Sequence, residues 1–336
     1  MDSIMKPRAF LVVSESTTAR FVRNAVVAAA VATICGSCRD SVAPPDPAAD
    51  LVWTLASGGS GATLVDISGT GAANIWAVGN DAILHYDGTS WSVAASGFNQ
   101  NLTAVRAITA TDAWAVGSAG AIQHWDGASW TSVAGVTTST LADVWGANSS
   151  DVWAVGGDPV AGTGEILHFD GTSWTIIDTG TGFVTGVWGS SPSDVWFVGV
   201  RKNGFASAHP ETLFHFNGSS FNLVAIGPYD FYGVWGTSPS DVWAVGADGD
   251  IGQAVVFHFN GINWFETSIE DNQTLYSVWG TSPSDVWIAG NAPDLLRHYD
   301  GNSWSPIRHP SPIRAGWSSS ASDVWAVGEG LFHATP

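Results

Sequence analysis

The fold is decided by two short sequence motifs that recur along the chain. Between residues 151 and 174 they read Asp151-Val-Trp-Ala-Val-Gly156 and, after a short connection, His168-Phe-Asp-Gly-Thr-Ser-Trp174. The first motif is a nearly continuous apolar run, typical of a strand that is covered on both faces. The second contains Asp-Gly, which tolerates positive φ and so predicts a hairpin turn between two strands.

The two motifs and the residues that flank them predict a unit of four strands. We predict an inner strand A at 141–145, strand B at 151–155, strand C at 165–169 and an outer strand D beginning at Trp174. A repeated four-stranded unit of about 40 residues is typical of a propeller blade. The sequence therefore predicts an all-β protein whose blades pack face to face around an axis.

Seven copies of the unit occupy residues 51–336. A Trp on strand B marks each copy, and the copies follow one another at steps of 38, 39, 43, 47, 44 and 38 residues. Five copies carry a second Trp on strand A, and seven His residues share one slot on strand C. The repeat Trp residues are Trp76, Trp114, Trp153, Trp196, Trp243, Trp287 and Trp325, and the repeat His residues are His85, His124, His168, His215, His258, His298 and His333.

The two ends of the repeat region complement each other. The seventh copy ends after strand C, whereas residues 51–58 match a spare strand D at the start of the region. We therefore predict a seven-bladed β-propeller of four-stranded blades, in which the N-terminal strand completes the last blade and closes the ring. Closure also removes the unpaired sheet edges that favour aggregation.

Residues that recur in every blade are predicted to be structural. A Trp at the same position of each strand B is most simply explained by packing between blades, with stacking on a sugar as the alternative. Strand B begins where strand C ends, so antiparallel pairing brings Asp151 near His168 and repeats this pair in the other blades. A hydrogen bond between them would satisfy both groups. Metal binding by the His residues is the alternative, and no resident cofactor is expected.

The first 37 residues are predicted to be a leader. Basic residues precede an apolar run at 25–34, which is too short to span a bilayer but suits a signal peptide. The following Ile34-Cys-Gly-Ser-Cys38 resembles a bacterial lipobox, which implies cleavage before Cys38 and lipidation of that residue. Ordinary secretion and a Cys-x-x-Cys pair are the alternatives. Residues 38–50, rich in Pro and Ala, are predicted to be a disordered tether. We expect an exported protein of the bacterial cell envelope, in contact with the membrane only through its lipid.

Composition excludes one class of partner. The 336 residues contain 30 acidic and 11 basic side chains, a formal net charge of −19. Nucleic-acid binding needs a basic surface, so no nucleic-acid partner is expected. A glycan or an envelope protein remains as the ligand, and we expect a monomer.

The candidate site lies on the loops between strands B and C. These loops vary in length and are longest in blades 3, 4 and 5, and loops on a rigid scaffold often carry binding. The longest loop has an adjacent basic pair and a His outside the repeat, and blade 5 adds an Asp-x-Asp motif for which calcium is an alternative. The candidate ligand-binding residues are Arg201, Lys202, His209, Glu211, Asp248, Asp250, Arg308 and His309.

The repeat resembles the bacterial propeller repeats of the tectonin-type lectins and, less closely, the Asp-box repeats of sialidases. The motifs at 151–156 and 168–174 carry the resemblance, which covers 51–336. It implies either a non-catalytic glycan- or protein-binding propeller, which we favour, or a sialidase-like glycan hydrolase. Such an enzyme would need Arg, Tyr and Glu converging on the central channel. Arg106 and Arg314 fall on inner strands, but no sialidase motif surrounds them, so no catalytic residue is predicted.

Overall fold

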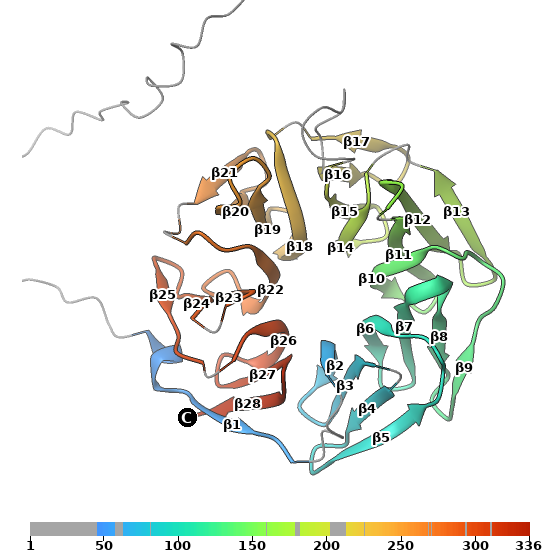
Figure 1. The fold of residues 1–336 in the computed structure, drawn as a ribbon, viewed down its shortest axis with the longest axis horizontal. Helices are drawn as coiled ribbons and strands as arrows, with labels where there is room; N and C mark the ends of the chain where they lie inside the picture. The colour runs from blue at the N-terminus through green and yellow to red at the C-terminus, as the bar shows by residue number, and fades with distance from the viewer. Residues whose placement is uncertain are drawn as a thin grey trace, which may run out of the picture. The chain divides into compact units, whose positions relative to one another are not determined.

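The computed structural model describes residues 46–57, 63–80, 82–158, 160–178, 182–201, 213–224, 226–267, 269, 271–292, 294–309 and 311–336. Within these ranges the chain forms seven four-stranded antiparallel sheets arranged around an axis (Figure 1). The predicted seven-bladed propeller is thereby confirmed. Cys38 and the predicted leader lie outside the described residues, as do Lys202, His209 and Glu211. No helix in the described ranges is long and apolar enough to cross a membrane.

Six blades follow the chain order from the axis outward. Blade 1 contains β2 (Leu64–Gly71), β3 (Asn74–Gly79), β4 (Ala82–Tyr86) and β5 (Trp91–Ser96). Blade 2 contains β6 (Leu102–Thr109), β7 (Asp112–Gly117), β8 (Ile122–Trp125) and β9 (Trp130–Ser132), with the short helix η3 (Ser118–Gly120) between β7 and β8. Blade 3 contains β10 (Thr140–Asn148), β11 (Asp151–Asp158), β12 (Thr163–Phe169) and β13 (Trp174–Asp178). Blade 4 contains β14 (Val184–Ser191), β15 (Asp194–Gly199), β16 (Leu213–Phe216) and β17 (Phe221–Leu223). Blade 5 contains β18 (Tyr229–Ser238), β19 (Asp241–Asp248), β20 (Ala254–Phe259) and β21 (Trp264–Thr267). Blade 6 contains β22 (Leu275–Ser282), β23 (Asp285–Gly290), β24 (Leu296–Tyr299) and β25 (Trp304–Pro306).

Blade 7 joins the two ends of the chain. It contains β26 (Ile313–Ser320), β27 (Asp323–Gly328) and β28 (Leu331–Thr335), and its outer strand is β1 (Val52–Leu55). β1 pairs antiparallel with β28, with Trp53 opposite Ala334, so the predicted closure is also confirmed.

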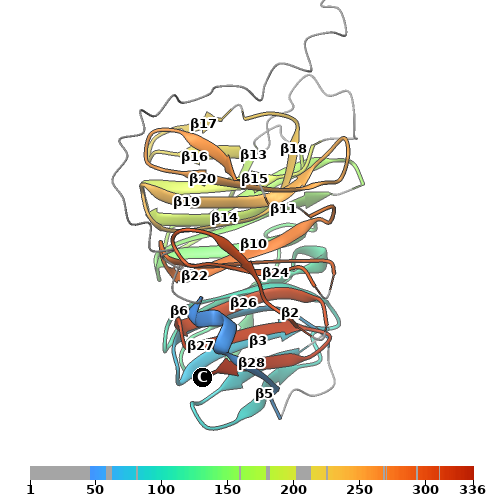
Figure 2. The same ribbon diagram turned by 90° about the vertical axis from the view of Figure 1, so that its left-hand side faces the viewer.

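A short helix, η2 (Pro47–Asp50), precedes β1 and lies beside the strands of the last blade (Figure 2). Ala48 is buried, and the carboxylate of Asp46 lies 2.7 Å from His298 Nδ1 of blade 6. The other ring nitrogen of His298 lies 2.8 Å from Asp285. Residues 46–50 therefore belong to the folded unit and not to the predicted tether, because a carboxylate and a buried methyl group fix them to the ring.

Aromatic side chains fill the spaces between blades. The strand-B Trp residues are at most 4% exposed. Each packs near-perpendicular to an outer-strand aromatic ring of the next blade, as Trp114 does on Trp174 at 5.3 Å between ring centroids. Around the circle this includes Trp287 on Trp53 and Trp325 on Trp91, which secure the last blade on both sides. The contacts support packing, and not sugar stacking, as the role of these Trp residues.

The repeat His residues pack against the same Trp rings. The centroids of each Trp–His pair are between 3.9 and 4.6 Å apart. His Nε2 lies within 3.5 Å of an Asp at the start of strand B, or of Asn74 in blade 1. In blade 5 the second oxygen of that Asp accepts from Thr237, at 2.5 Å. The contact is a hydrogen bond in six blades, whereas in blade 3 His168 Nε2 lies 3.5 Å from Asp151 and has no hydrogen-bond partner. The role of these His residues is structural.

The Asp-Gly dipeptides form the turns of the outer hairpins, as predicted. Asp170 Oδ1 accepts hydrogen bonds from the N–H groups of Thr172 and Ser173, both at 2.9 Å, and Gly171 has a φ of +89°. A Cβ at Gly171 would also lie 2.6 Å from the side chain of Ser150 in the neighbouring turn. The turn therefore needs Gly for both its backbone conformation and its close contact.

Candidate functional site

The loop residues that the sequence singled out have partners within the protein. Arg201 is at most 8% exposed at its side chain, and its Nε lies 3.2 Å from Asp230 and its Nη1 3.4 Å from Asp250. Burial by itself would lower the pKa of Arg201, but the hydrogen bonds and charges of these two carboxylates outweigh burial and raise it. The guanidinium therefore joins blade 4 to blade 5 and is not available to a ligand in this arrangement.

The other described loop candidates are also structural or separate. Asp248 Oδ1 accepts from the backbone N–H of Asp250 at 2.8 Å, which closes the turn. His309 is buried, and its ring contacts those of Trp53 and Phe332 at centroid distances of 5.0 and 4.4 Å. Arg308 is exposed. Within the described ranges no cluster of three or more His, Cys, Asp or Glu residues could hold a metal ion, so the calcium alternative finds no ligand set there.

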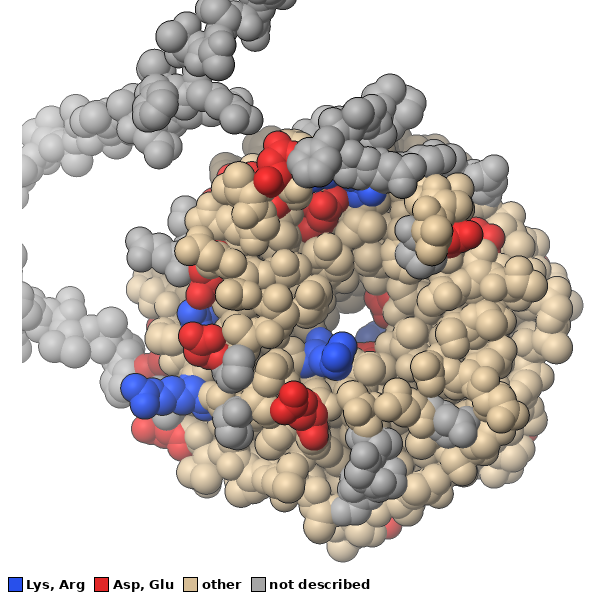
Figure 3. All heavy atoms as spheres, viewed as in Figure 1, with Lys and Arg blue, Asp and Glu red and all other residues tan. Residues whose placement is uncertain are grey.

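A second set of residues converges on the axis of the ring. The innermost strands surround a cavity of about 290 Å³. Viewed along the axis, the ring has a central opening with basic and acidic side chains at its rim and inside it (Figure 3). This cavity is the candidate functional site.

A bulge in every innermost strand supplies one part of the cavity wall. The pairing of strands A and B shifts register just after strand A begins, for example between Ile313 and Ala315. The residue at the bulge, here Arg314, lines the cavity, because a bulge redirects its side chain out of the regular alternation. The bulge residues that line it are Val65, Thr103, Ala142, Thr185, Tyr232, Tyr276 and Arg314.

The strand-A Trp slot supplies the second part of the wall. Trp145, Trp188, Trp235, Trp279 and Trp317 occupy it in blades 3 to 7. In several blades the indole packs over a Gly of the next inner strand, and a Cβ at Gly189 would lie 2.7 Å from the ring of Trp145. Blades 1 and 2 depart from this pattern, because Ser68 and Arg106 stand opposite Trp76 and Trp114 where the other blades have a strand-A Trp.

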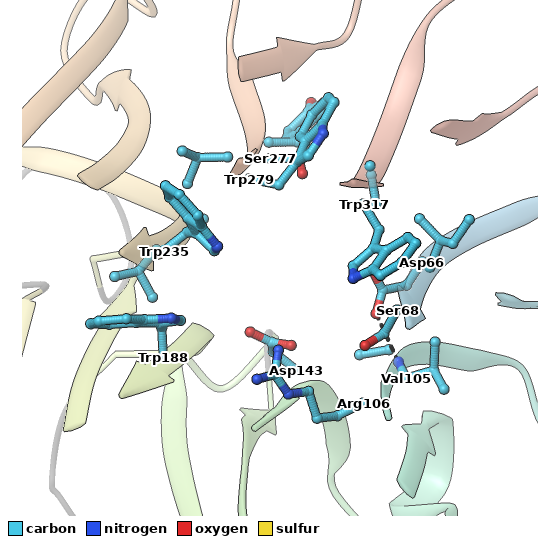
Figure 4. Close-up of a pocket in the computed structure, with 18 of the residues that line it drawn as sticks. Asp66, Ser68, Val105, Arg106, Asp143, Trp188, Trp235, Ser277, Trp279 and Trp317 are labelled. Carbon is cyan, nitrogen blue, oxygen red and sulfur yellow. Dashed lines mark hydrogen bonds between the residues drawn. The ribbon is translucent and has the colours of Figure 1, made fainter. Parts of the chain in front are cut away.

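Arg106 projects into the cavity close to two carboxylates that are engaged elsewhere (Figure 4). Asp66 accepts a hydrogen bond from Val105 N at 2.7 Å, and Asp143 accepts one from Val187 N at 2.9 Å. Each carboxylate thus links its blade to the next one. No described carboxylate forms an ion pair with Arg106, and its Nε is buried without a hydrogen-bond partner.

Burial shifts the pKa values of Asp66, Arg106 and Asp143. The three residues are partly exposed and line the cavity that the innermost strands surround. Burial, and then the charge of Asp143, raises the pKa of Asp66 to about 8. Burial also raises the pKa of Asp143 to about 6 and lowers that of Arg106, which still stays charged at neutral pH. At neutral pH the cavity thus holds two guanidinium groups, an ionised Asp143 and a mostly protonated Asp66.

The cavity lacks the pair of groups that a sialidase-like mechanism would need. Arg106, Arg314, Tyr232 and Tyr276 converge there, but none of the described residues that line the cavity is Glu. Burial, followed by the charges of Asp230 and Tyr276, raises the pKa of Tyr232, which makes its hydroxyl a poorer nucleophile. The described lining therefore holds no Tyr–Glu pair of the kind that a sialidase-like mechanism would use.

Comparison with known proteins places the chain by fold. No protein-family model matches it, and no curated protein is similar to it in sequence. A solved structure of YCF48 bound to D1 peptide is 16% identical, with a TM-score of 0.63, over 85% of this chain and 95% of that one. YCF48 from Cyanidioschyzon merolae is 13% identical, with a TM-score of 0.64, over 84% and 99%.

The extracellular domain of the one-component system BT4673 from B. thetaiotaomicron has a similar ring. It is 12% identical, with a TM-score of 0.64, over 84% of this chain and 39% of that one. Identities this low support the propeller architecture alone, because unrelated functions share this fold. The resemblance to tectonin-type and Asp-box repeats stays a prediction.

Proposed function

We propose that this chain is an exported, non-catalytic binding propeller that recognises a glycan or a protein on the face of its B–C loops. The D–A loops, which join the outer strand of one blade to the inner strand of the next, share that face. One observation carries the proposal: the departures from the repeat on the inner strands gather around a single cavity. Arg314, which directly follows a D–A loop, is exposed and lines that cavity. A structural role alone would not require the inner strands to differ among blades whose outer parts are alike.

The solved neighbours support binding as the class of function. YCF48 has been solved with a D1 peptide, and the BT4673 ring is the extracellular domain of a one-component system. The glycan-hydrolase alternative has no comparable support, because none of the described residues that line the cavity is a Glu beside the two Tyr.

The proposed function can be tested with the mature protein. A glycan array and a crosslinking capture from envelope extract would each be run with wild type and with Tyr276→Ala, which changes an exposed ring at the cavity wall. We expect a retained ligand whose signal falls in the variant. Phe265→Ala, which removes an exposed ring on the outer strand of blade 5, serves as the control. Turnover of a reporter glycoside by wild type would instead establish the hydrolase.

The proposed location rests on Cys38 and can be tested separately. Metabolic labelling with a fatty acid should mark the full-length protein and place it in the membrane fraction. Cys38→Ser should abolish the label and release the protein from that fraction. A labelled Cys38→Ser variant, or an unlabelled wild type in soluble extract, would contradict a lipid anchor at this residue.

A further inference from the structure

Unpartnered hydrogen-bond donors surround the cavity. The indole nitrogens of Trp188, Trp235 and Trp317 turn toward its centre (Figure 4). Elsewhere some indole N–H groups find an acceptor, as Trp153 does on Asp151 at 2.8 Å, whereas those of most Trp residues between the blades are buried without one. The three cavity indoles differ from these in that they face an open space that a ligand can enter. No described residue accepts a hydrogen bond from the cavity-facing indoles, although Trp188 is only 7% exposed.

The same cavity holds an unpaired cation. Arg106 has no carboxylate at ion-pair distance among the described residues, and its Nε is buried without a partner. A buried donor without an acceptor costs free energy that a ligand oxygen would recover. Arg314 adds a second guanidinium at the wall, with no ion pair to the described part of the chain. Donors of this kind, aimed at one space, select an oxygen acceptor that carries negative charge.

We propose that the central cavity binds the carboxylate group of a small ligand, held between the Arg106 guanidinium and the indole N–H groups of Trp188, Trp235 and Trp317. This inference rests on the proposed binding function and names the chemical class that the site takes. A volume of about 290 Å³ lies at the lower limit for ligand pockets, so the ligand is about the size of a monosaccharide, such as a uronate.

The charge balance favours a monoanion over the dianion of a phosphate monoester. Two guanidinium groups face one ionised carboxylate, Asp143, because Asp66 keeps its proton at neutral pH. The surplus of about one positive charge matches a single carboxylate. A dianion would leave uncompensated negative charge beside Asp143, which is unfavourable in a partly desolvated space.

Nuclear magnetic resonance of the indole N–H groups tests the proposal without any substitution. Sodium glucuronate would be added to the ¹⁵N-labelled mature protein, with glucose as the neutral counterpart and sodium chloride as the inorganic anion. We expect saturable shifts at Trp188, Trp235 and Trp317 with glucuronate alone, and none at buried strand-B indoles such as Trp76. Equal shifts with chloride or with glucose, or shifts spread over all indoles, would overturn the carboxylate assignment.

Calorimetry with matched charge variants gives the second measurement. Arg106→Gln should weaken glucuronate binding by about tenfold or more, because it removes a charge-assisted hydrogen bond. Arg314→Gln, at an exposed position, gives a folded variant with a smaller loss should Arg106→Gln fail to fold. Arg297→Gln makes the same charge change outside the cavity, at a residue that pairs with Asp271, and should bind like wild type. Unchanged binding in Arg106→Gln and Arg314→Gln would sink the inference.

The outcome is separable from that of the proposed function. A protein that captures a glycan or an envelope protein equally well with and without Arg106 would keep the binding function and refute the carboxylate site. A protein that binds glucuronate through Arg106 but captures no macromolecule would keep the site and refute recognition of a glycan or protein.

Discussion

The middle and outer parts of the blades differ from the inner wall in how strictly they repeat. On strands B and C every blade has the same Trp beside the same His, and six blades pair that His with Asp. On strand A, blades 3 to 7 carry Trp, whereas blades 1 and 2 carry Ser68 and Arg106. The repeated residues are explained by the packing that every blade needs. A blade that departs from the repeat is therefore better evidence of a functional site than the mere presence of Trp or His.

Removing the closing segment should have the largest effect, since it breaks the repetition of the outer part at one blade. Deletion of residues 46–56 removes the outer strand of blade 7, the Trp53 contact with Trp287 and the Asp46 contact with His298. We expect the melting temperature to fall by about 10 °C or more. Differential scanning calorimetry of the deletion variant measures this, and an unchanged melt would contradict closure by β1.

The two kinds of Trp should differ in cost when removed. Trp287 is 0% exposed, and Trp287→Ala should lower the free energy of unfolding by about 3–5 kcal/mol. Trp235 is half-buried at the cavity, and Trp235→Ala should cost only about 1–2 kcal/mol, because less apolar surface is lost. Denaturant titration compares the two variants. A Trp235→Ala cost equal to that of Trp287→Ala would mean that the inner Trp residues are as structural as the outer ones.

The repeated part of the molecule could be predicted from the sequence, because short recurring motifs determine it. Trp spacing fixed the blade count, the missing final strand matched the spare first one, and the shared ends of strands B and C placed His168 near Asp151. Packing of identical units needs identical residues, so the pattern in the chain and the pattern in space coincide there.

The cavity could not be predicted in the same way. The sequence does show the signal, since only five copies have the strand-A Trp and Arg106 falls on an inner strand. However, the bulge that directs Arg314 into the cavity depends on strand register, which the repeat spacing does not give. The long loop was the more visible departure, yet its Arg201 is held by Asp230 across a blade boundary. Loop length therefore identified a face of the ring but not the residues that form the site.

The raised pKa of Asp66 predicts how the inner wall responds to pH. A carboxyl whose pKa rises on folding, here from 3.8 to about 8, stabilises the fold fully below pH 4 and loses that contribution as pH rises to 8. Wild type should therefore melt at lower temperature at pH 8 than at pH 5. Asp66→Asn keeps an acceptor for Val105 N and stays neutral, so it should exceed wild type by about 1–3 kcal/mol at pH 8.

The comparison of the two proteins removes the titrations that they share and leaves that of Asp66, together with its coupling to the charge of Asp143. His298 also has a raised pKa, because its bonds to Asp285 and Asp46 outweigh burial, and its contribution likewise falls as pH rises. That contribution is common to wild type and Asp66→Asn, and it cancels in their difference. A difference that is independent of pH between 5 and 8 would show that the cavity does not hold a proton on Asp66.

Restoring the repeat at Arg106 should have the smallest effect on stability. Arg106→Trp places the residue of five other blades in the same slot and removes a buried, unpartnered Nε. The gain is limited because Ile108 already fills the space over Gly146, where the indole of the preceding blade would pack. We expect the free energy of unfolding to change by less than about 1 kcal/mol. A loss larger than this in denaturant titration would mean that Arg106 supports the fold, whereas a neutral result would leave ligand binding as the reason that blade 2 departs from the repeat.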